Sequence, residues 1–178
     1  MVDQEAEGDA IDPIKDIKDT AKLLTDGKML HVMPIIIWSA ISLSCYAAIF
    51  VPLLTRTMIH SYDDGQNPSL DTESARSQQA LLTIILIGVG EMIGGVGVIG
   101  PIRDKFGNRI ALVVLIILTA AGLAVFFVYN HVDQYNWLAF VMCLIWGIQD
   151  AGVNCLINCI LGFEFKSKST PFSVFKFV

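Results

Sequence analysis

The sequence predicts an all-α, polytopic membrane protein with four transmembrane helices, and three observations support this fold class. Hydrophobic residues make up 54% of the 178 residues, and the mean hydropathy is +0.61. Charged residues are only 16%, against ~25% in an ordinary soluble domain. The apolar residues gather in four runs, each long enough to cross a bilayer core, which takes ~20 helical residues. Strands are not expected, because a lipid-exposed strand would leave its backbone polar groups unpaired.

The polar segments divide the chain into spans and connections. We expect helices over residues 29–54, 80–102, 110–129 and 137–163. Residues 1–28 form a polar N-terminal segment, in which residues 11–24 fit either an amphipathic helix on the membrane surface or a solvated linker. Residues 164–178 are expected to be a tail or the start of a truncated fifth helix.

The distribution of basic residues predicts that both termini are cytoplasmic, because Lys and Arg favour the cytoplasmic side. All 12 basic residues except Arg56 and Arg76 lie before the first run, between the second and third, or after the fourth. The connection 55–79 is therefore expected outside. The net charge of −5 argues against a nucleic-acid partner, which needs concentrated Lys and Arg.

The sequence offers little for catalysis or metal binding. The four cysteines all lie in apolar runs, where a free Cys behaves as a small hydrophobe. Cys155 and Cys159 are four residues apart, but no His accompanies them, so a metal site is not expected. We find no Ser/His/Asp, Cys/His or phosphate-loop pattern. An enzyme is the least expected class, and no cofactor is expected.

Two acids lie near the middle of predicted spans, where a charge costs at least ~2.5–3.5 kcal/mol and usually faces protein or water. Glu91 lies in the second span, and Asp150 in the fourth. Asp150, Asn154 and Asn158 recur every four residues and make a polar stripe ~12 Å long. Two interpretations stay open: a proton- or ion-coupled site, or hydrogen bonds of ~0.6–2 kcal/mol each between helices.

A groove of small residues accompanies Glu91 in the second span. Gly90, Gly94 and Gly97 follow i, i+4, i+7 spacing, so they share one side of a helix. Such a surface lets another helix approach closely. We therefore predict a helix-packing contact there.

A charged turn over residues 100–109 joins the second and third spans. Gly100 is expected to allow close helix approach, and Gly107 a tight backbone. Asp104 is expected near the positive end of the next helix, with Lys105 and Arg109 able to pair with it or with lipid headgroups. The spacing G-x-x-x-D-K-x-G-x-R resembles the cytoplasmic signature loop of the major facilitator superfamily, which joins the second and third helices of each six-helix half. This resemblance implies a structural latch between conformations.

Further motifs resemble one branch of that superfamily, the uncoordinated-93-like, or ion channel regulatory, proteins. The fourth span, "WGIQDAGVNCLINCILGFEF", is similar to the branch's G-x-x-D-A-x-x-N pattern. "LLTDGKMLHVMPIIIWSAISLSCYAAIF" resembles its seventh helix, "GVGEMIGGVGVIGPIRDKFGNR" its eighth helix and the following loop, and "TPFSVFKFV" the start of its eleventh helix. The resemblance covers residues 22–178 and implies the C-terminal half of a twelve-helix protein. The branch's better-known members regulate potassium channels or escort receptors.

Three functions follow as expectations. The first is regulation or escort of a partner ion channel or receptor. The alternatives are a fragment of a proton- or ion-coupled solute transporter, and a structural subunit of a larger membrane complex. Each implies contact with the lipid bilayer and with a membrane-protein partner or the missing half of the bundle. A truncated gene model, a gene-fission product and a subunit completed by other chains would all fit.

Overall fold

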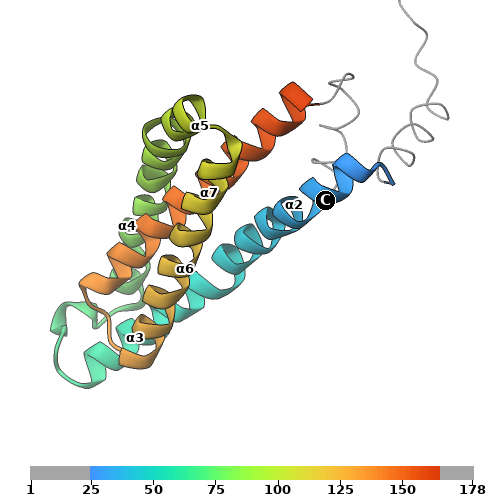
Figure 1. Ribbon diagram of the computed structural model, residues 1–178. Coiled ribbons are helices and arrows are strands. Elements are labelled where there is room, and N and C mark those ends of the chain that lie inside the picture. Colours follow the sequence, from blue (N-terminus) through green and yellow to red (C-terminus); the bar gives the residue numbers. More distant parts are fainter. Residues whose placement is uncertain (1–24, 165–178) are drawn as a thin grey trace, which may run out of the picture.

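The computed structural model describes residues 25–164, which form helices and no strand (Figure 1). Four helical stretches are long and apolar enough to cross a membrane: Gly27–Asp63, Glu73–Phe106, Asn108–Val132 and Trp137–Phe163. The all-α fold class and the four spans are therefore confirmed. The possible amphipathic segment 11–24 and the tail lie outside the described residues.

The first span contains α2 (Gly27–Cys45), a π-helical stretch η1 (Tyr46–Phe50) and α3 (Val51–Asp63). Asp26 caps its start, accepting a hydrogen bond from the Lys28 N–H at 3.0 Å. Pro52 is the second residue of α3, just after η1. Because proline lacks an N–H and its ring crowds the carbonyl four residues earlier, it favours a widened turn at this position.

The second span repeats this arrangement. A short 3-10 helix, η2 (Pro68–Leu70), precedes α4 (Glu73–Met92), η3 (Ile93–Ile99) and α5 (Gly100–Phe106). Thr72 caps α4, and its side chain accepts from the Ala75 N–H at 3.2 Å. Pro101 follows the π-helical η3, as Pro52 follows η1. Each of the first two spans therefore changes its helical register partway through.

The third and fourth spans are uninterrupted. Helix α6 covers Asn108–Val132 and ends at Asp133, which has a left-handed backbone (φ 51°). Helix α7 covers Trp137–Glu164, and the Asn136 side chain accepts from the Leu138 N–H at 2.9 Å. The first three observed spans extend further at both ends than the spans predicted from the sequence. Polar residues continue these helices, because a helix satisfies its own backbone groups outside as well as inside the hydrocarbon.

Helix α7 is the centre of the bundle, packing against α4, α6 and α2. Figure 1 shows α2 slanting away from α4 and α6. Buried apolar residues form two clusters. The first, the α3-end cluster, contains Phe50, Leu53, Leu54, Met58, Leu70, Ala80, Ile87, Tyr129, Tyr135, Ala139, Met142, Cys143 and Trp146. The second, the α5-end cluster, contains Met29, Val32, Ile36, Ile99, Ala111, Leu115, Val153, Leu156, Ile157 and Leu161.

Glycines bring α4 and α7 into backbone contact. A Cβ added to Gly90 would lie 2.9 Å from the Ile148 nitrogen, and one added to Gly94 would lie 2.6 Å from the Ile148 Cα. From the other side, a Cβ on Gly147 would lie 2.9 Å from the carbonyl carbon of Ile87. These distances are too short for any side chain. Glycine is therefore required at all three positions for this packing.

Gly97 departs from the predicted groove. A Cβ on Gly97 would meet none of the described atoms within 4 Å, whereas Ile99 is fully buried. The buried positions thus run Gly90, Gly94, Ile99, with a step of five residues across the π-helical η3. The i, i+4, i+7 spacing assumed a regular α-helix, and the wider π turn rotates Gly97 away from α7.

Candidate functional site

The candidate site is a group of polar side chains where α2 faces α7, here called the polar seam. Helix α2 contributes Ser39 and Ser42, and α7 contributes Asp150 and Asn154. Sequence reasoning identified Asp150 and Asn154 but not the two serines. Isolated serines in an apolar run carry no motif, and only their helical spacing of three residues could have indicated a shared face.

Hydrogen bonds link the two helices through Asn154. The Ser39 hydroxyl donates to Asn154 Oδ1 at 3.0 Å. The Asn154 side-chain nitrogen donates to the backbone carbonyl of Asp150 at 3.1 Å and to Asp150 Oδ2 at 3.2 Å. Asn154 thus fixes one carboxylate oxygen of Asp150 while it is itself oriented by α2.

The other half of the seam has unmet hydrogen-bonding capacity. Among the described residues, the buried side-chain nitrogens and oxygens without a hydrogen-bond partner are Ser42 Oγ and Asp150 Oδ1 of the seam, and Trp38 Nε1, Trp146 Nε1 and Gln149 Nε2. Ser42 is 0% exposed. The Ser42 hydroxyl and the Asp150 carboxyl nevertheless lie within hydrogen-bonding reach of each other. Buried polar groups without well-formed hydrogen bonds are rare in native proteins, so this loosely paired hydroxyl and carboxyl call for an explanation.

The seam lies between the two apolar clusters. Along the first span, the buried residues of the α5-end cluster reach Ile36 in α2 and those of the α3-end cluster begin at Phe50 in η1, with Ser39 and Ser42 between them. Along α7, Trp146 belongs to the first cluster and Val153 to the second. Asp150 therefore stands near the middle of its span. At this depth an isolated charge is costly, so the carboxylate needs a proton, a cation or water.

The other two predicted polar residues are placed differently. Glu91 of α4 is exposed on the surface of the described bundle, although its carboxylate lies near enough to Asp150 for the two negative charges to repel. Asn158 is also exposed, one turn beyond Asn154. The structure thus joins Asp150 and Asn154 to α2, while Glu91 and Asn158 face outward from the four helices.

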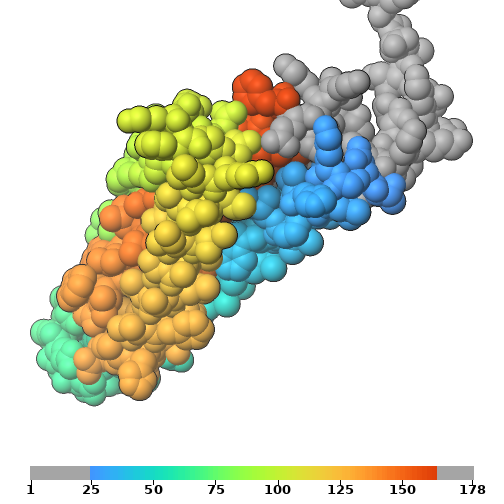
Figure 2. Space-filling model, viewed as in Figure 1, coloured from blue at the N-terminus to red at the C-terminus, as the bar shows by residue number. Residues whose placement is uncertain are grey.

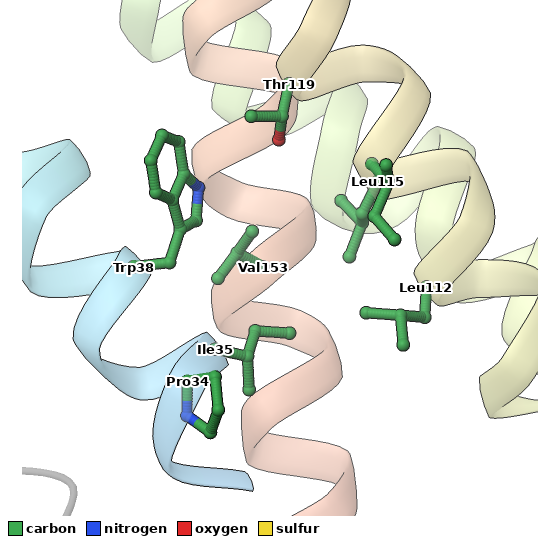
Figure 3. A pocket seen from close by; sticks show the side chains of 8 residues that line it. Pro34, Ile35, Trp38, Leu112, Leu115, Thr119 and Val153 are labelled. Atoms are coloured by element: carbon green, nitrogen blue, oxygen red, sulfur yellow. The ribbon is translucent and has the colours of Figure 1, made fainter. Parts of the chain in front are cut away.

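An apolar cavity of about 270 Å³ adjoins the seam between α2, α6 and α7 (Figure 3). Figure 3 shows Trp38 entering it from α2, Leu112, Leu115 and Thr119 from α6, and Val153 from α7. In the space-filling view of Figure 2, α2 (blue) runs beside α6 (yellow). The cavity lining is almost entirely hydrocarbon, so the polar chemistry is confined to the neighbouring seam.

The predicted charged turn is mostly helical. Helix α5 extends through Phe106, so the backbone reverses only at Gly107, with φ 85° and ψ 173°. This conformation requires glycine, as the sequence suggested. A Cβ on Gly100 would lie 3.0 Å from the carbonyl oxygen of Gly95 in its own helix. No atom of another helix among the described residues lies within 4 Å of that Cβ, so the expected close contact of Gly100 with another helix is not seen there.

The charges of this loop also pair differently from the expectation. Asp104, with a side chain 75% exposed, pairs with Arg103 at 3.3 Å rather than with Lys105 or Arg109 among the described residues. The Lys105 ammonium lies over the ring of its neighbour Phe106, and Arg109 is exposed. Asp104 lies on α5 itself and is not at the start of the next helix, because α5 continues beyond it.

Arg103 is the residue of this loop that sequence reasoning missed. Its side chain is only 20% exposed. Its Nε donates to Asn108 Oδ1 at 3.2 Å, and its guanidinium lies 5.0 Å from the centre of the Phe163 ring. Arg103 therefore joins α5, the start of α6 and the end of α7. Its place outside the D-K-x-G-x-R spacing hid this role.

Comparisons with known proteins agree with the four-span architecture. Searches of curated proteins and of solved structures found no significant match. A model of the Major Facilitator Superfamily matches residues 3–178, nearly the whole chain. The chain therefore belongs to the Major Facilitator Superfamily.

Proposed function

We propose that this chain is a helical unit of a membrane carrier and that its polar seam binds a proton or a small inorganic cation. The observation that carries this proposal is the Asp150 carboxylate near mid-span, with one oxygen fixed by Asn154 and the Ser42 hydroxyl of α2 within reach of the carboxyl. A cation bound between the Asp150 carboxylate and the Ser42 hydroxyl would be coordinated from both helices. Membership of a superfamily of transporters supports the same proposal.

The position of the seam supports coupling to movement. Asp150 and Ser42 lie on different helices, and the seam separates two apolar clusters that can each stay packed. Loading the seam with a cation would draw α2 towards α7, and release would weaken that contact. The cation would therefore bind the arrangement with α2 close to α7 more tightly than the arrangement with the two helices apart. Any ligand-driven conformational change requires such a difference in affinity.

The test is cation-dependent stabilisation of the full-length chain in detergent. Sodium and potassium chloride are compared with choline chloride at equal ionic strength, and the pH is varied separately. A bound cation at 100 times its dissociation constant stabilises a protein by about 2.7 kcal/mol. We expect one of these cations, or protons, to stabilise the wild type but not Asp150→Asn. Asp63→Asn, which replaces an exposed acid on α3, is the control and should be stabilised as the wild type is. An equal response in Asp150→Asn would contradict the proposal.

The second candidate is the regulation or escort of a partner membrane protein, as in the uncoordinated-93-like branch. Glu91 favours it: an exposed carboxylate partway along a span is costly against lipid, so a partner helix with a complementary group would cover it. We expect Glu91→Gln to weaken a co-purifying membrane partner while leaving the cation response intact. If Glu91→Gln and Asp150→Asn both lower stability and alter nothing else, the polar groups serve only as hydrogen-bonding contacts between helices.

A further inference from the structure

The cavity between α2, α6 and α7 has a buried polar atom on its largely hydrocarbon lining. Trp38 lines the cavity, and its indole nitrogen is a buried donor without a hydrogen-bond partner among the described residues. Figure 3 shows this nitrogen on the edge of the ring that faces α7. Because a buried indole N–H usually finds a partner, an acceptor for Trp38 is to be sought in the cavity.

The cavity has buried walls on one side and exposed side chains on the other. Leu115 of α6 and Val153 of α7 are each only 2% exposed and form the inner wall. Leu112 and Ile116 of α6 are 42% and 60% exposed, and Pro34 of α2 is exposed as well. These exposed residues belong to membrane spans. A ligand would therefore enter from the hydrocarbon of the bilayer rather than from water.

Trp38 and Thr119 lie at the deep end of the cavity. Trp38, Thr119 and Val153 are each 11 residues from the start of α2, the start of α6 and the end of α7, respectively. This is about 16 Å of helix, and half of a hydrocarbon core is ~15 Å, so these side chains lie near mid-depth. Leu112 is only four residues into α6 and lies nearer the interface. The ester groups of membrane lipids, at that interface, are therefore far from the indole nitrogen.

The volume and the lining of the cavity define the chemical class of the ligand. The volume is about 270 Å³, and a protein cavity of ~150 Å³ holds benzene, so there is room for roughly 11 non-hydrogen atoms. The described lining residues include no charged side chain, and an ionised ligand would be costly in such surroundings. The Trp38 N–H can only donate, and the Thr119 hydroxyl can donate as well. The matching group on the ligand is an acceptor such as a carbonyl oxygen.

We propose that this cavity binds an uncharged, largely hydrocarbon carbonyl compound dissolved in the membrane, whose oxygen accepts a hydrogen bond from the Trp38 N–H. A lipid acyl chain would fill the same space but leave the indole donor unpaired, which is unfavourable away from water. A ketone of matching size both fills the space and pairs the donor. This site is separate from the polar seam, and the proposal does not depend on cation binding there.

The test is nuclear magnetic resonance of the full-length, isotope-labelled chain in dodecyl maltoside, a detergent whose tail carries no carbonyl group. The probes are methyl octyl ketone and undecane, which have equal numbers of non-hydrogen atoms, although only the ketone has an acceptor. The chain contains three tryptophans, each with its own indole N–H resonance. We expect the ketone, but not undecane, to move the Trp38 resonance in the direction of hydrogen bonding. Trp146, packed against Phe50 with ring centres 4.9 Å apart, should respond to neither probe.

Affinities for both probes come from titration of the Leu115 and Val153 methyl resonances. Trp38→Phe keeps an aromatic ring but loses the donor, so it should lower the preference for the ketone over undecane by about 2- to 12-fold, as expected for one hydrogen bond. Trp137→Phe, at a tryptophan that is 69% exposed, should keep the wild-type preference. Equal wild-type affinities for the two probes, or an unchanged preference in Trp38→Phe, would overturn the proposal. So would a Trp38 resonance that is already hydrogen-bonded and that neither probe moves, since another protein segment would then cover the cavity.

Discussion

Replacing Gly94 by alanine should destabilise the bundle, because α4 and α7 touch there through their backbones. The added Cβ would lie 2.6 Å from the Ile148 Cα and 2.8 Å from its carbonyl carbon, and still closer to the Ile148 oxygen. Every one of these neighbours is a backbone atom of a helix. None can rotate away as a flexible side chain would, so the whole helix must move.

The size of the effect follows from that movement. The two helices must separate by roughly 1 Å before the new contact becomes ordinary, which would loosen the adjacent contacts at Gly90 and Gly147. Overpacking in a well-packed core typically costs about 1–3 kcal/mol. Alanine is also a better helix former than glycine, so the substitution regains about 0.5–1 kcal/mol of stability. The central values of these two ranges give a net loss of about 1 kcal/mol, within limits of about 0–2.5 kcal/mol.

The assay is thermal unfolding of the purified chain followed by tryptophan fluorescence, with Gly88→Ala as the matched control. A Cβ on Gly88, in the same helix, meets none of the described atoms within 4 Å. Gly88→Ala should therefore raise the midpoint by a few degrees, whereas Gly94→Ala should lower it by roughly 1–10 °C. If both substitutions raised the midpoint equally, the reasoning about the α4–α7 contact would be refuted.

Three other substitutions test separate parts of the structure by the same assay. Gly107→Ala should cost roughly 1–3 kcal/mol, because its backbone conformation (φ 85°, ψ 173°) is essentially restricted to glycine; an unchanged midpoint would exclude that conformation. Ser39→Ala should cost about 1–3 kcal/mol by leaving the Asn154 carbonyl unpaired, and Ser39→Thr should cost less; equal losses would argue against the hydrogen bond. Arg103→Lys should lower the midpoint by about 1–4 °C, since lysine cannot both bind Asn108 and stack on Phe163; Lys105→Arg should leave it unchanged.

The spans could be predicted from sequence because bilayer thickness imposes a minimum apolar length. Their ends could not, because hydropathy records where the hydrocarbon ends and not where the helix ends. Residues after Leu54 and before Ala80 illustrate this: they are polar, yet α3 continues to Asp63 and α4 begins at Glu73. Helix caps at Thr72 and Asp26 were the available local signals for the starts.

The site was partly predictable for a different reason. A carboxylate in an apolar run is conspicuous, so Asp150 could be identified, and four-residue spacing joined Asn154 to it. Which helix faces them depends on tertiary packing, so Ser39 and Ser42 stayed hidden. The placement of Gly97 failed because extrapolation of a 3.6-residue period takes no account of a π turn. Pro101, four residues later, was the only local sign of that turn.

The most direct test of the account is whether α2 and α7 meet at the polar seam in the membrane. Cysteines are placed at Ser39 and Asn154, whose side chains are joined by a 3.0 Å hydrogen bond, after the four native cysteines are replaced. The connection at residues 64–72 is made cleavable, so the two halves stay together only through a disulfide. Under mild oxidation in native membranes, we expect the Ser39/Asn154 pair to link the halves and a Ser39/Asn158 pair to link them far less. Equal linkage, or none for either pair, would contradict the seam on which the proposed cation binding depends.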